Sequence, residues 1–310
     1  MADSPEPVTL AWPDAVTVVD VTPRDGLQDA PTSIPTEAKL AYITAMLDAG
    51  VRHIEATSFM HPAWIPQLAD ADALAARLLR RQGVHYSALI PNMRGYERAR
   101  AAGISTVALV VSASESHNRA NLNRSIAESL AQLADVATRA REDGVALRGS
   151  VSTAFGCPFE GAVAVAAVMR VVRAYVAMGV TDLSLADTIG VGHPRQVYEL
   201  FTAVRKEAPA TVHLSGHFHD RSGYGLANVF AALQAEVTTF DAAVGGLGGC
   251  PYAPGAPGNL AMEELVEFLE RMGLHTGISL DGVQSARVQL EEALAGGVPV
   301  QRRTPTPTAR

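Results

Sequence analysis

The sequence of 310 residues is 48% hydrophobic and 18% charged, which provides enough apolar material to bury a large core. Its formal net charge of −7 argues against a nucleic-acid-binding protein, because such proteins usually carry a basic excess. Only two cysteines are present, Cys157 and Cys250, so we expect no disulfide scaffold and a cytoplasmic location. No apolar stretch reaches membrane-spanning length, and the N-terminus has no secretory pattern.

Short β-branched stretches alternate along the chain with longer amphipathic stretches. Eight of the short stretches are predicted to be strands, at residues 16–22, 53–59, 85–90, 106–113, 147–154, 182–188, 212–219 and 239–244. Their apolar character on both faces is typical of parallel strands. Helical spacing of apolar residues predicts helices between and after the strands, at residues 36–49, 64–81, 93–102, 125–142, 160–178, 194–207, 223–235, 259–271 and 279–295.

Eight alternations of strand and helix, with no change of composition between them, favour an α/β fold: a (β/α)8 TIM barrel with an extra C-terminal helix. We predict one catalytic domain over residues 1–300 and a mobile tail over residues 301–310, where Thr, Pro and Arg predominate. The alternative is an open, doubly wound sheet that binds a dinucleotide. That fold would need a Gly-x-Gly-x-x-Gly motif after the first strand, and the sequence has none there.

Polar and ionisable side chains gather where the predicted strands end. They are Arg24 and Asp25 after the first strand, Glu55 in the second, Asp187 in the sixth, His217 and His219 in the seventh, and Asn259 after the eighth. The C-terminal ends of barrel strands meet at the face that carries the active site. Burying such groups singly costs free energy, so each needs a partner or a metal. The pattern therefore predicts an active site at this mouth of the barrel.

His217 and His219 form the sharpest local signal. Side chains two residues apart on a strand point to the same side, so both imidazoles face one point. For an isolated His-x-His pair the alternative, two core histidines with satisfied hydrogen bonds, would be favoured. Here the pair ends a barrel strand and Asp25 follows another strand, which favours a metal site. Carboxylate, amide and imidazole ligands suit Mg²⁺ or Mn²⁺ better than structural zinc, which usually takes thiolates.

Four further residues are candidates for catalysis. Arg24 offers a fork of donors for a carboxylate or a developing enolate oxygen, although Arg-Asp-Gly on its own also fits a surface ion pair. Cys250 follows a glycine-rich stretch and could serve as a general acid or base, whereas an inert buried cysteine is the alternative. Glu55 and Asp187 could act as general bases or orient a metal ligand. A structural ion pair with an arginine such as Arg148 is equally compatible with either carboxylate.

Six stretches carry a resemblance to a known family. They are Thr-Pro-Arg-Asp-Gly-Leu-Gln at 22–28, Ile-Glu-Ala-Thr-Ser-Phe at 54–59, Gly-Cys-Pro-Phe-Glu-Gly at 156–161, Ser-Leu-Ala-Asp-Thr-Ile-Gly-Val-Gly at 184–192, His-Phe-His-Asp at 217–220 and Gly-Gly-Leu-Gly-Gly-Cys-Pro-Tyr-Ala at 245–253. From about residue 16 to 276 the sequence resembles the 3-hydroxy-3-methylglutaryl-CoA lyase family, within the barrel metalloenzymes that include isopropylmalate synthases. The stretch at 245–253, followed by Gly-Asn-Leu at 258–260, is the most specific to the lyases.

The resemblance implies a divalent-metal site with four ligands: Asp25, His217, His219 and Asn259. It implies that Arg24 neutralises the thioester enolate or a carboxylate oxygen, and that Cys250 is the catalytic thiol on a closing loop. Glu55 and Asp187 would support the metal site and proton transfer, and Gln28 would contact the acyl-CoA substrate. The implied reaction is a retro-aldol type cleavage of 3-hydroxy-3-methylglutaryl-CoA to acetoacetate and acetyl-CoA.

Some positions differ from the family pattern. Arg221 and Ser222 stand where Thr-Tyr is usual after His-x-His-Asp, and Pro31 stands where a lysine is common. Residues 296–303 replace the Asn-Arg-Lys-Thr-Ser-like stretch that family members have near the CoA nucleotide. These differences concern the acyl group and the CoA contacts more than the metal chemistry.

Three other functions are compatible with parts of the pattern. One is the same cleavage of another 3-hydroxyacyl-CoA, such as a longer-branched hydroxyglutaryl-CoA. A second is an acetyl-CoA-condensing synthase, which the Cys250 loop and the lack of a long C-terminal extension disfavour. A third is a barrel without catalysis that binds a CoA ester or a protein, which the intact set of site residues disfavours. A homodimer is expected for barrels of this kind, although no stretch identifies an interface.

Overall fold

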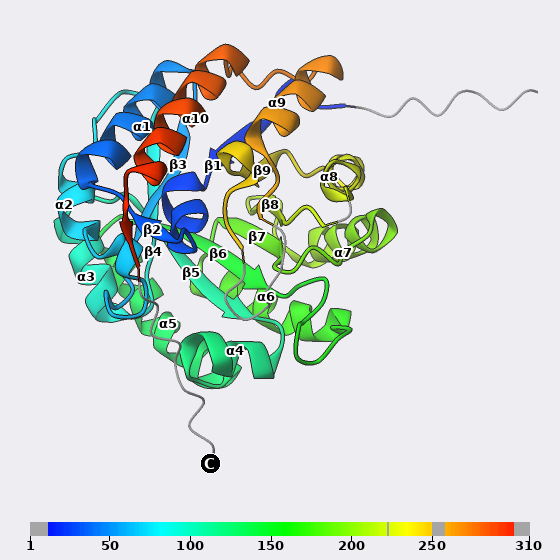
Figure 1. Cartoon of the computed structure of the whole chain (residues 1–310). Coiled ribbons are helices and arrows are strands. Elements are labelled where there is room, and N and C mark those ends of the chain that lie inside the picture. The colour runs from blue at the N-terminus through cyan, green and yellow to red at the C-terminus, as the bar shows by residue number, and fades with distance from the viewer. Residues whose placement is uncertain (1–11, 222, 250–257, 301–310) are drawn as a thin grey trace, which may run out of the picture.

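The computed structural model of the chain describes residues 12–221, 223–249 and 258–300. Eight parallel strands form a closed barrel in the order β1-β3-β4-β5-β6-β7-β8-β9 (Figure 1). Their bounds are β1 (Thr17–Asp20), β3 (His53–Ser58), β4 (His85–Leu89), β5 (Thr106–Ser112), β6 (Ala146–Ser152), β7 (Asp182–Asp187), β8 (His213–Phe218) and β9 (Thr239–Ala242). The barrel closes because β1 pairs with β3 on one side and with β9 on the other.

Helices surround the barrel (Figure 1). They are α1 (Thr36–Asp48), α2 (Ala71–Ala76), α3 (Met93–Ala101), α4 (Glu115–Leu122), α5 (Ile126–Glu142), α6 (Val165–Met178), α7 (Pro194–Glu207), α8 (Gly225–Gln234), α9 (Met262–Arg271) and α10 (Leu280–Ala295). The extra C-terminal helix α10 packs against both α1 and α9. The predicted TIM barrel with an added C-terminal helix is therefore confirmed.

The predicted strands match the observed ones to within two residues at either end. The prediction for residues 64–81 was wrong in extent, because this stretch folds as a 3-10 turn at Pro66–Leu68 followed by the short helix α2. Pro66 has no backbone N–H to donate, so it begins a helical turn rather than extending one. Helix α4 was not predicted. It begins at the cap Ser114 and ends at Asn123, which takes a left-handed conformation with a φ of 53°.

Strand parity divides the barrel into an apolar exterior and a polar interior. In β8, Leu214 and Phe218 belong to the main hydrophobic core between the barrel and its helices. Ser215 and His217 have the opposite parity and contact buried polar side chains of other strands. A polar barrel interior is costly unless its groups are paired, and the interior side chains of β8 are paired with Arg148 and Asp241.

A second, two-stranded sheet lies outside the barrel. Strand β2 (Thr32–Ser33) pairs antiparallel with β10 (Val298–Pro299), which brings the end of the described chain beside the loop that follows β1. Residues 301–310, predicted to be a mobile tail, lie outside the described residues. Within the described ranges, every helix is too short or too polar to cross a membrane.

Candidate active site at the C-terminal mouth of the barrel

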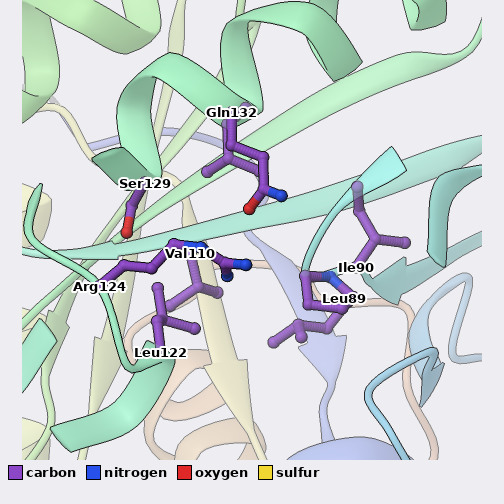
Figure 2. Close-up of a pocket in the computed structure, with 9 residues that line it drawn as sticks. Leu89, Ile90, Val110, Leu122, Arg124, Ser129 and Gln132 are labelled. Atoms are coloured by element: carbon purple, nitrogen blue, oxygen red, sulfur yellow. The ribbon is translucent and has the colours of Figure 1, made fainter. Parts of the chain in front are cut away.

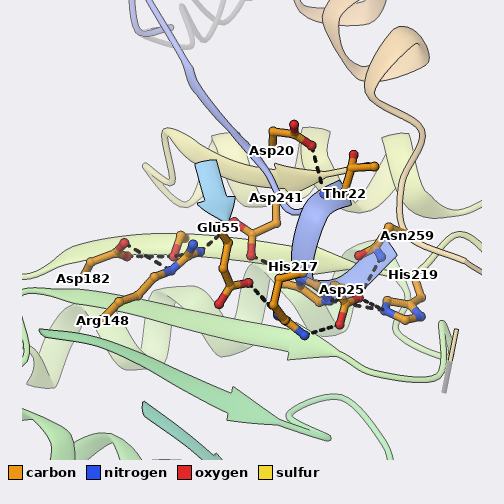
Figure 3. A network of polar contacts seen from close by, with 12 residues as sticks. Asp20, Thr22, Asp25, Glu55, Arg148, Asp182, His217, His219, Asp241 and Asn259 are labelled. Atoms are coloured by element: carbon orange, nitrogen blue, oxygen red, sulfur yellow. Dashed lines mark hydrogen bonds and ion pairs between the residues drawn. The ribbon is translucent and has the colours of Figure 1, made fainter. Parts of the chain in front are cut away.

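Three side chains predicted as metal ligands lie together in the structure. Asp25, His217 and His219 are all buried, and their potential ligand atoms lie within 4.8 Å of one another. The Nε2 atoms of the two histidines are 3.2 Å apart. Oδ2 of Asp25 is 3.9 Å from Nε2 of His217 and 3.8 Å from Nε2 of His219. Residues separated by nearly two hundred positions in the sequence thus converge at the C-terminal end of the barrel (Figure 3).

Local backbone structure explains this convergence. His217 lies inside β8 and His219 just beyond its end, so strand parity turns both rings the same way. Asp25 lies in a tight π-helical turn, Thr22–Gly26, which directly follows β1. The backbone N–H of Asp25 donates to the carbonyl oxygen of Val21 at 2.7 Å, which folds the turn back over the barrel mouth.

Asn259, the fourth predicted ligand, completes the cluster. It forms a backbone bridge with His219, and its Nδ2 donates to Oδ2 of Asp25 at 2.7 Å and to the carbonyl oxygen of Leu247 at 2.9 Å. Its Oδ1 is buried and has no hydrogen-bond partner among the described residues. A buried acceptor without a donor is costly, so this oxygen is suited to bind a ligand. A carboxylate, two imidazoles and this amide oxygen together fit a divalent cation.

His217 is held from behind by a buried polar network (Figure 3). Its Nδ1 lies 3.1 Å from Oδ2 of Asp241 in β9, and Oδ1 of Asp241 accepts from Nη2 of Arg148 at 2.6 Å. A neutral His217 that donates from Nδ1 presents its Nε2 lone pair to the cluster. Burial lowers the pKa of His217, but the carboxylates of Asp241 and Asp25 outweigh this effect, and the pKa is raised overall.

Arg24 lies between two carboxylates at the rim of the cluster. Its Nε donates to Oε2 of Glu55 at 2.8 Å, and its Nη1 donates to Oδ1 of Asp25. Burial disfavours its charge, but Asp25 and Glu55 outweigh burial and raise the pKa of Arg24. The pKa of Asp25 is lowered, because Arg24 and the histidines outweigh the opposing effect of burial. Gln28 reaches the same carboxylate, with its Nε2 3.2 Å from Oδ1 of Asp25.

Asp187 has a different environment. Its two carboxylate oxygens accept the backbone N–H groups of Val191 at 3.0 Å and Gly192 at 2.9 Å, which fixes the loop between β7 and α7. Its carbonyl oxygen accepts the N–H of His219 at 3.4 Å. Burial raises the pKa of Asp187. Asp187 therefore lies against the metal cluster through backbone contacts.

Neither Glu55 nor Asp187 pairs with Arg148, the structural partner considered from the sequence. Arg148 instead bonds Asp241 and lies 3.3 Å from Oδ2 of Asp182. Asp241, the residue that orients His217, was not among the predicted site residues. Its signal was an aspartate within a short apolar strand, the same signal that identified Glu55 and Asp187.

The glycine-rich stretch after β9 packs directly on the cluster. Val244 N donates to Oγ1 of Thr22, and Gly245 N donates to the carboxylate of Glu263, so the loop is anchored from two sides. At Gly248, with a φ of +116°, an added Cβ would lie 2.4 Å from Nδ2 of Asn259. Only glycine permits this approach. Cys250, the predicted catalytic thiol, lies outside the described residues.

A small cavity beside β4, β5 and α5 is separate from this site (Figure 2). Its volume of about 20 Å³ and its lining by Val110, Arg124, Gln132 and neighbouring residues suit a water molecule. None of its lining residues belongs to the metal cluster, and it is too small for a substrate.

Comparison with known proteins places the chain in a family. The HMGL-like family model matches residues 15–288. The chain is 44% identical to the hydroxymethylglutaryl-CoA lyase YngG of Bacillus subtilis, over 94% of this chain and 97% of that protein. It is 43% identical to the mitochondrial hydroxymethylglutaryl-CoA lyase of Bos taurus, over 91% of this chain and 87% of that protein.

Solved structures agree with the sequence comparisons. The structure of an HMG-CoA lyase from Acinetobacter baumannii in complex with coenzyme A and 3-methylmalate superposes with a TM-score of 0.88 at 38% identity, covering 97% of this chain and 99% of that one. The carboxyl transferase domain of Rhizobium etli pyruvate carboxylase, at 16% identity and a TM-score of 0.67, shares the fold alone. The chain therefore belongs to the hydroxymethylglutaryl-CoA lyase family, as the HMGL-like match and the extent of these similarities show.

Proposed function

We propose that this protein is a metal-dependent lyase that cleaves 3-hydroxy-3-methylglutaryl-CoA to acetoacetate and acetyl-CoA. The observation that carries the proposal is the buried cluster of Asp25, His217 and His219, next to Arg24. Beside it lies Oδ1 of Asn259, for which the described part of the chain supplies no hydrogen-bond partner. The relatives that the chain matches over most of its length are named for this activity.

Four residues would hold the metal: Asp25, His217, His219 and Asn259. We propose Mg²⁺ or Mn²⁺, because the set combines oxygen and imidazole ligands without a thiolate. When bound, the cation supplies Lewis-acid activation of substrate oxygen atoms and fixes their orientation. Asp241 holds His217 in the tautomer that presents Nε2 to the cluster.

Arg24 would stabilise the charge that develops when the carbon–carbon bond breaks. Its guanidinium is fixed by Glu55 and Asp25, so its donors are oriented before the substrate arrives. In the reaction a base takes the proton of the tertiary hydroxyl, the bond between C2 and C3 breaks, and the electron pair passes to the thioester enolate. The Gln28 amide, next to Asp25, is placed to contact the substrate at the same rim.

Protonation of the enolate carbon then yields acetyl-CoA. We assign this proton to the thiol of Cys250 on the basis of its position in the lyase-specific stretch. Glu55 acts by positioning Arg24, and Asp187 acts by fixing the loop that precedes α7. The cytoplasmic location and the homodimer stay predictions.

The test is acetoacetate release from 3-hydroxy-3-methylglutaryl-CoA by chelator-stripped protein, with and without added Mg²⁺ or Mn²⁺. We expect turnover only with metal, and we expect His219→Ala to abolish it. The matched control is His213→Ala, at the exposed start of the same strand, which should keep parental activity. Turnover that survives both chelation and His219→Ala would refute the metal-dependent mechanism. Metal binding without cleavage would refute this substrate and leave another 3-hydroxyacyl-CoA.

A further inference from the structure

One buried cation of the barrel interior is not used in the chemistry proposed above. Arg148 lies in β6 and is only 5% exposed. Burying a charged side chain is costly, so a fold keeps it only where fixed partners compensate for the lost water. Burial lowers the pKa of Arg148, but the carboxylates of Asp241, Asp182 and Glu55 outweigh burial and raise it. Arg148 therefore stays charged inside the barrel.

The side chain of Arg148 reaches across the barrel interior to a strand that is not its neighbour. Going round the barrel from β6, the strands follow in the order β7, β8 and β9. Nη2 of Arg148 donates to Oδ1 of Asp241 in β9 at 2.6 Å and to Oγ of Ser215 in β8 at 3.3 Å. Its Nε lies 3.3 Å from Oδ2 of Asp182 in β7. One guanidinium thus connects four consecutive strands of the barrel (Figure 3).

The contact of Arg148 with Asp241 is shorter and more deeply buried than its contact with Asp182. Asp241 is 5% exposed, whereas the side chain of Asp182, at the start of β7, is 32% exposed. A charge-assisted hydrogen bond is stronger where water is excluded. Arg148 therefore holds Asp241, which contacts His217, more firmly than it holds Asp182, which lies at the opposite end of the barrel.

The two carboxylate oxygens of Asp241 have different partners. Oδ1 accepts from Arg148, and Oδ2 lies 3.1 Å from Nδ1 of His217. A carboxylate is planar and turns as one unit about its Cβ–Cγ bond, so fixing Oδ1 also fixes the direction of Oδ2. His217 and Asp241 are paired in register in β8 and β9, so the backbone brings the two side chains together. The rotation of the carboxylate is then set by Arg148.

We propose that Arg148 is a positioning residue for the metal centre, which acts through Asp241 on the ring of His217. The inference rests on the proposed function for the presence of the metal. Without Arg148, the carboxylate of Asp241 would be free to turn away from Nδ1 of His217. The Nε2 lone pair of His217 would then no longer be held toward Asp25 and His219. Among the described residues, no hydrogen bond or ion pair joins Arg148 to a predicted metal ligand, so its effect should pass through Asp241.

The first experiment measures Mn²⁺ binding by calorimetry, so its result does not depend on turnover. We expect Arg148→Met to weaken binding about tenfold, the lower end of the usual effect of losing an outer partner of a metal ligand. Arg148→Lys should recover part of this loss, because it restores a cation beside Asp241. The matched control is Asp182→Asn, which removes the partner of Arg148 on the side away from the cluster and should leave Mn²⁺ affinity unchanged. Parental affinity in Arg148→Met, or an equal loss in Asp182→Asn, would overturn the inference.

The second experiment is a double-mutant cycle on Mn²⁺ affinity, which tests the route through Asp241. In a protein that already carries Asp241→Asn, adding Arg148→Met should weaken binding by no more than about twofold, because the partner through which Arg148 acts is already lost. Losses that add fully would overturn the inference, since they would place the effect of Arg148 elsewhere.

Arg148→Met leaves buried carboxylates unpaired, which threatens folding. Arg148→Gln replaces it if urea denaturation shows no folded state, because glutamine keeps a hydrogen-bond donor but lacks the charge and the fork of the guanidinium. The same loss of Mn²⁺ affinity is expected, and parental affinity would again overturn the inference. The predicted pattern of Mn²⁺ affinities in a protein that does not cleave 3-hydroxy-3-methylglutaryl-CoA would support the role of Arg148 and refute only the proposed substrate.

Discussion

Nδ1 of His217 lies 3.1 Å from Oδ2 of Asp241, inside the barrel and on the side of the ring that faces away from His219. This contact selects the tautomer of a predicted metal ligand. We expect Asp241→Asn to weaken Mn²⁺ binding about 10- to 100-fold, the usual effect of losing such a partner. Activity should recover at saturating metal, and metal titration followed by acetoacetate release would check both. Unchanged metal affinity would show that Asp241 serves the fold alone.

The approach of Gly248 to Asn259 leads to a second prediction. Gly248→Ala would bring a Cβ to 2.4 Å from Nδ2 of Asn259, so we expect metal binding and turnover to fall at least tenfold. Gly144→Ala is the matched control, because Gly144 also has a positive φ, of +68°, but has nothing within 4 Å of an added Cβ. Both variants should lose about 1 kcal/mol of stability through backbone strain, measured by urea denaturation. Equal activity in the two would contradict the close-approach argument.

A substitution at Arg24 can test whether the geometry of its guanidinium matters, or only its positive charge. Arg24→Lys keeps a cation beside Asp25 and Glu55 but cannot reproduce the two-sided hydrogen bonding of the guanidinium. We expect kcat to fall about 10²- to 10³-fold, the range for removal of a donor that stabilises a developing oxyanion. Calorimetric metal binding should be close to parental, which would separate this effect from loss of the cluster. A variant with parental kcat would remove Arg24 from the mechanism.

Asp20 makes the stability of the fold depend on pH. It is buried beneath the turn that carries Asp25, where its carboxylate accepts from Thr22 N and from the hydroxyl of Tyr42, each at 2.9 Å. Burial outweighs these bonds and raises the pKa of Asp20 from 3.8 to about 6. Between these values the folded state binds more protons than the unfolded state, so this group makes the protein less stable as pH rises from about 4 to 6.

Asp20→Asn should remove this dependence. Its free energy of unfolding relative to the parent should improve by about 2–3 kcal/mol between pH 4 and pH 6.5 and stay level above that. Urea denaturation of the metal-free protein across this range would measure the change, with the exposed Asp135→Asn as the charge control. A relative stability that does not vary with pH would refute the raised pKa of Asp20.

The barrel was predictable because its determinants are local. Buried parallel strands are short apolar stretches, and in this chain each is bounded by polar or glycine residues, so periodicity identified all eight strands. Helix α5 carries its own capping box, between Ser125 and Glu128. The two errors in the helix predictions also have local causes. Pro66 interrupts the helix predicted at 64–81, and α4 is too short and polar for its periodicity to stand out.

The candidate site, like the fold, was predictable from the sequence only in part. Strand parity alone determines that His217 and His219 point to one side, and strand ends alone determine that Arg24, Asp25 and Asn259 belong to one face. The sequence could not determine that Asp241 would orient His217, that Arg24 would lie between Asp25 and Glu55, or that Asp187 would bond backbone N–H groups rather than Arg148. Those pairings join distant parts of the chain, and burial leaves each charge only the partners that barrel closure brings within reach.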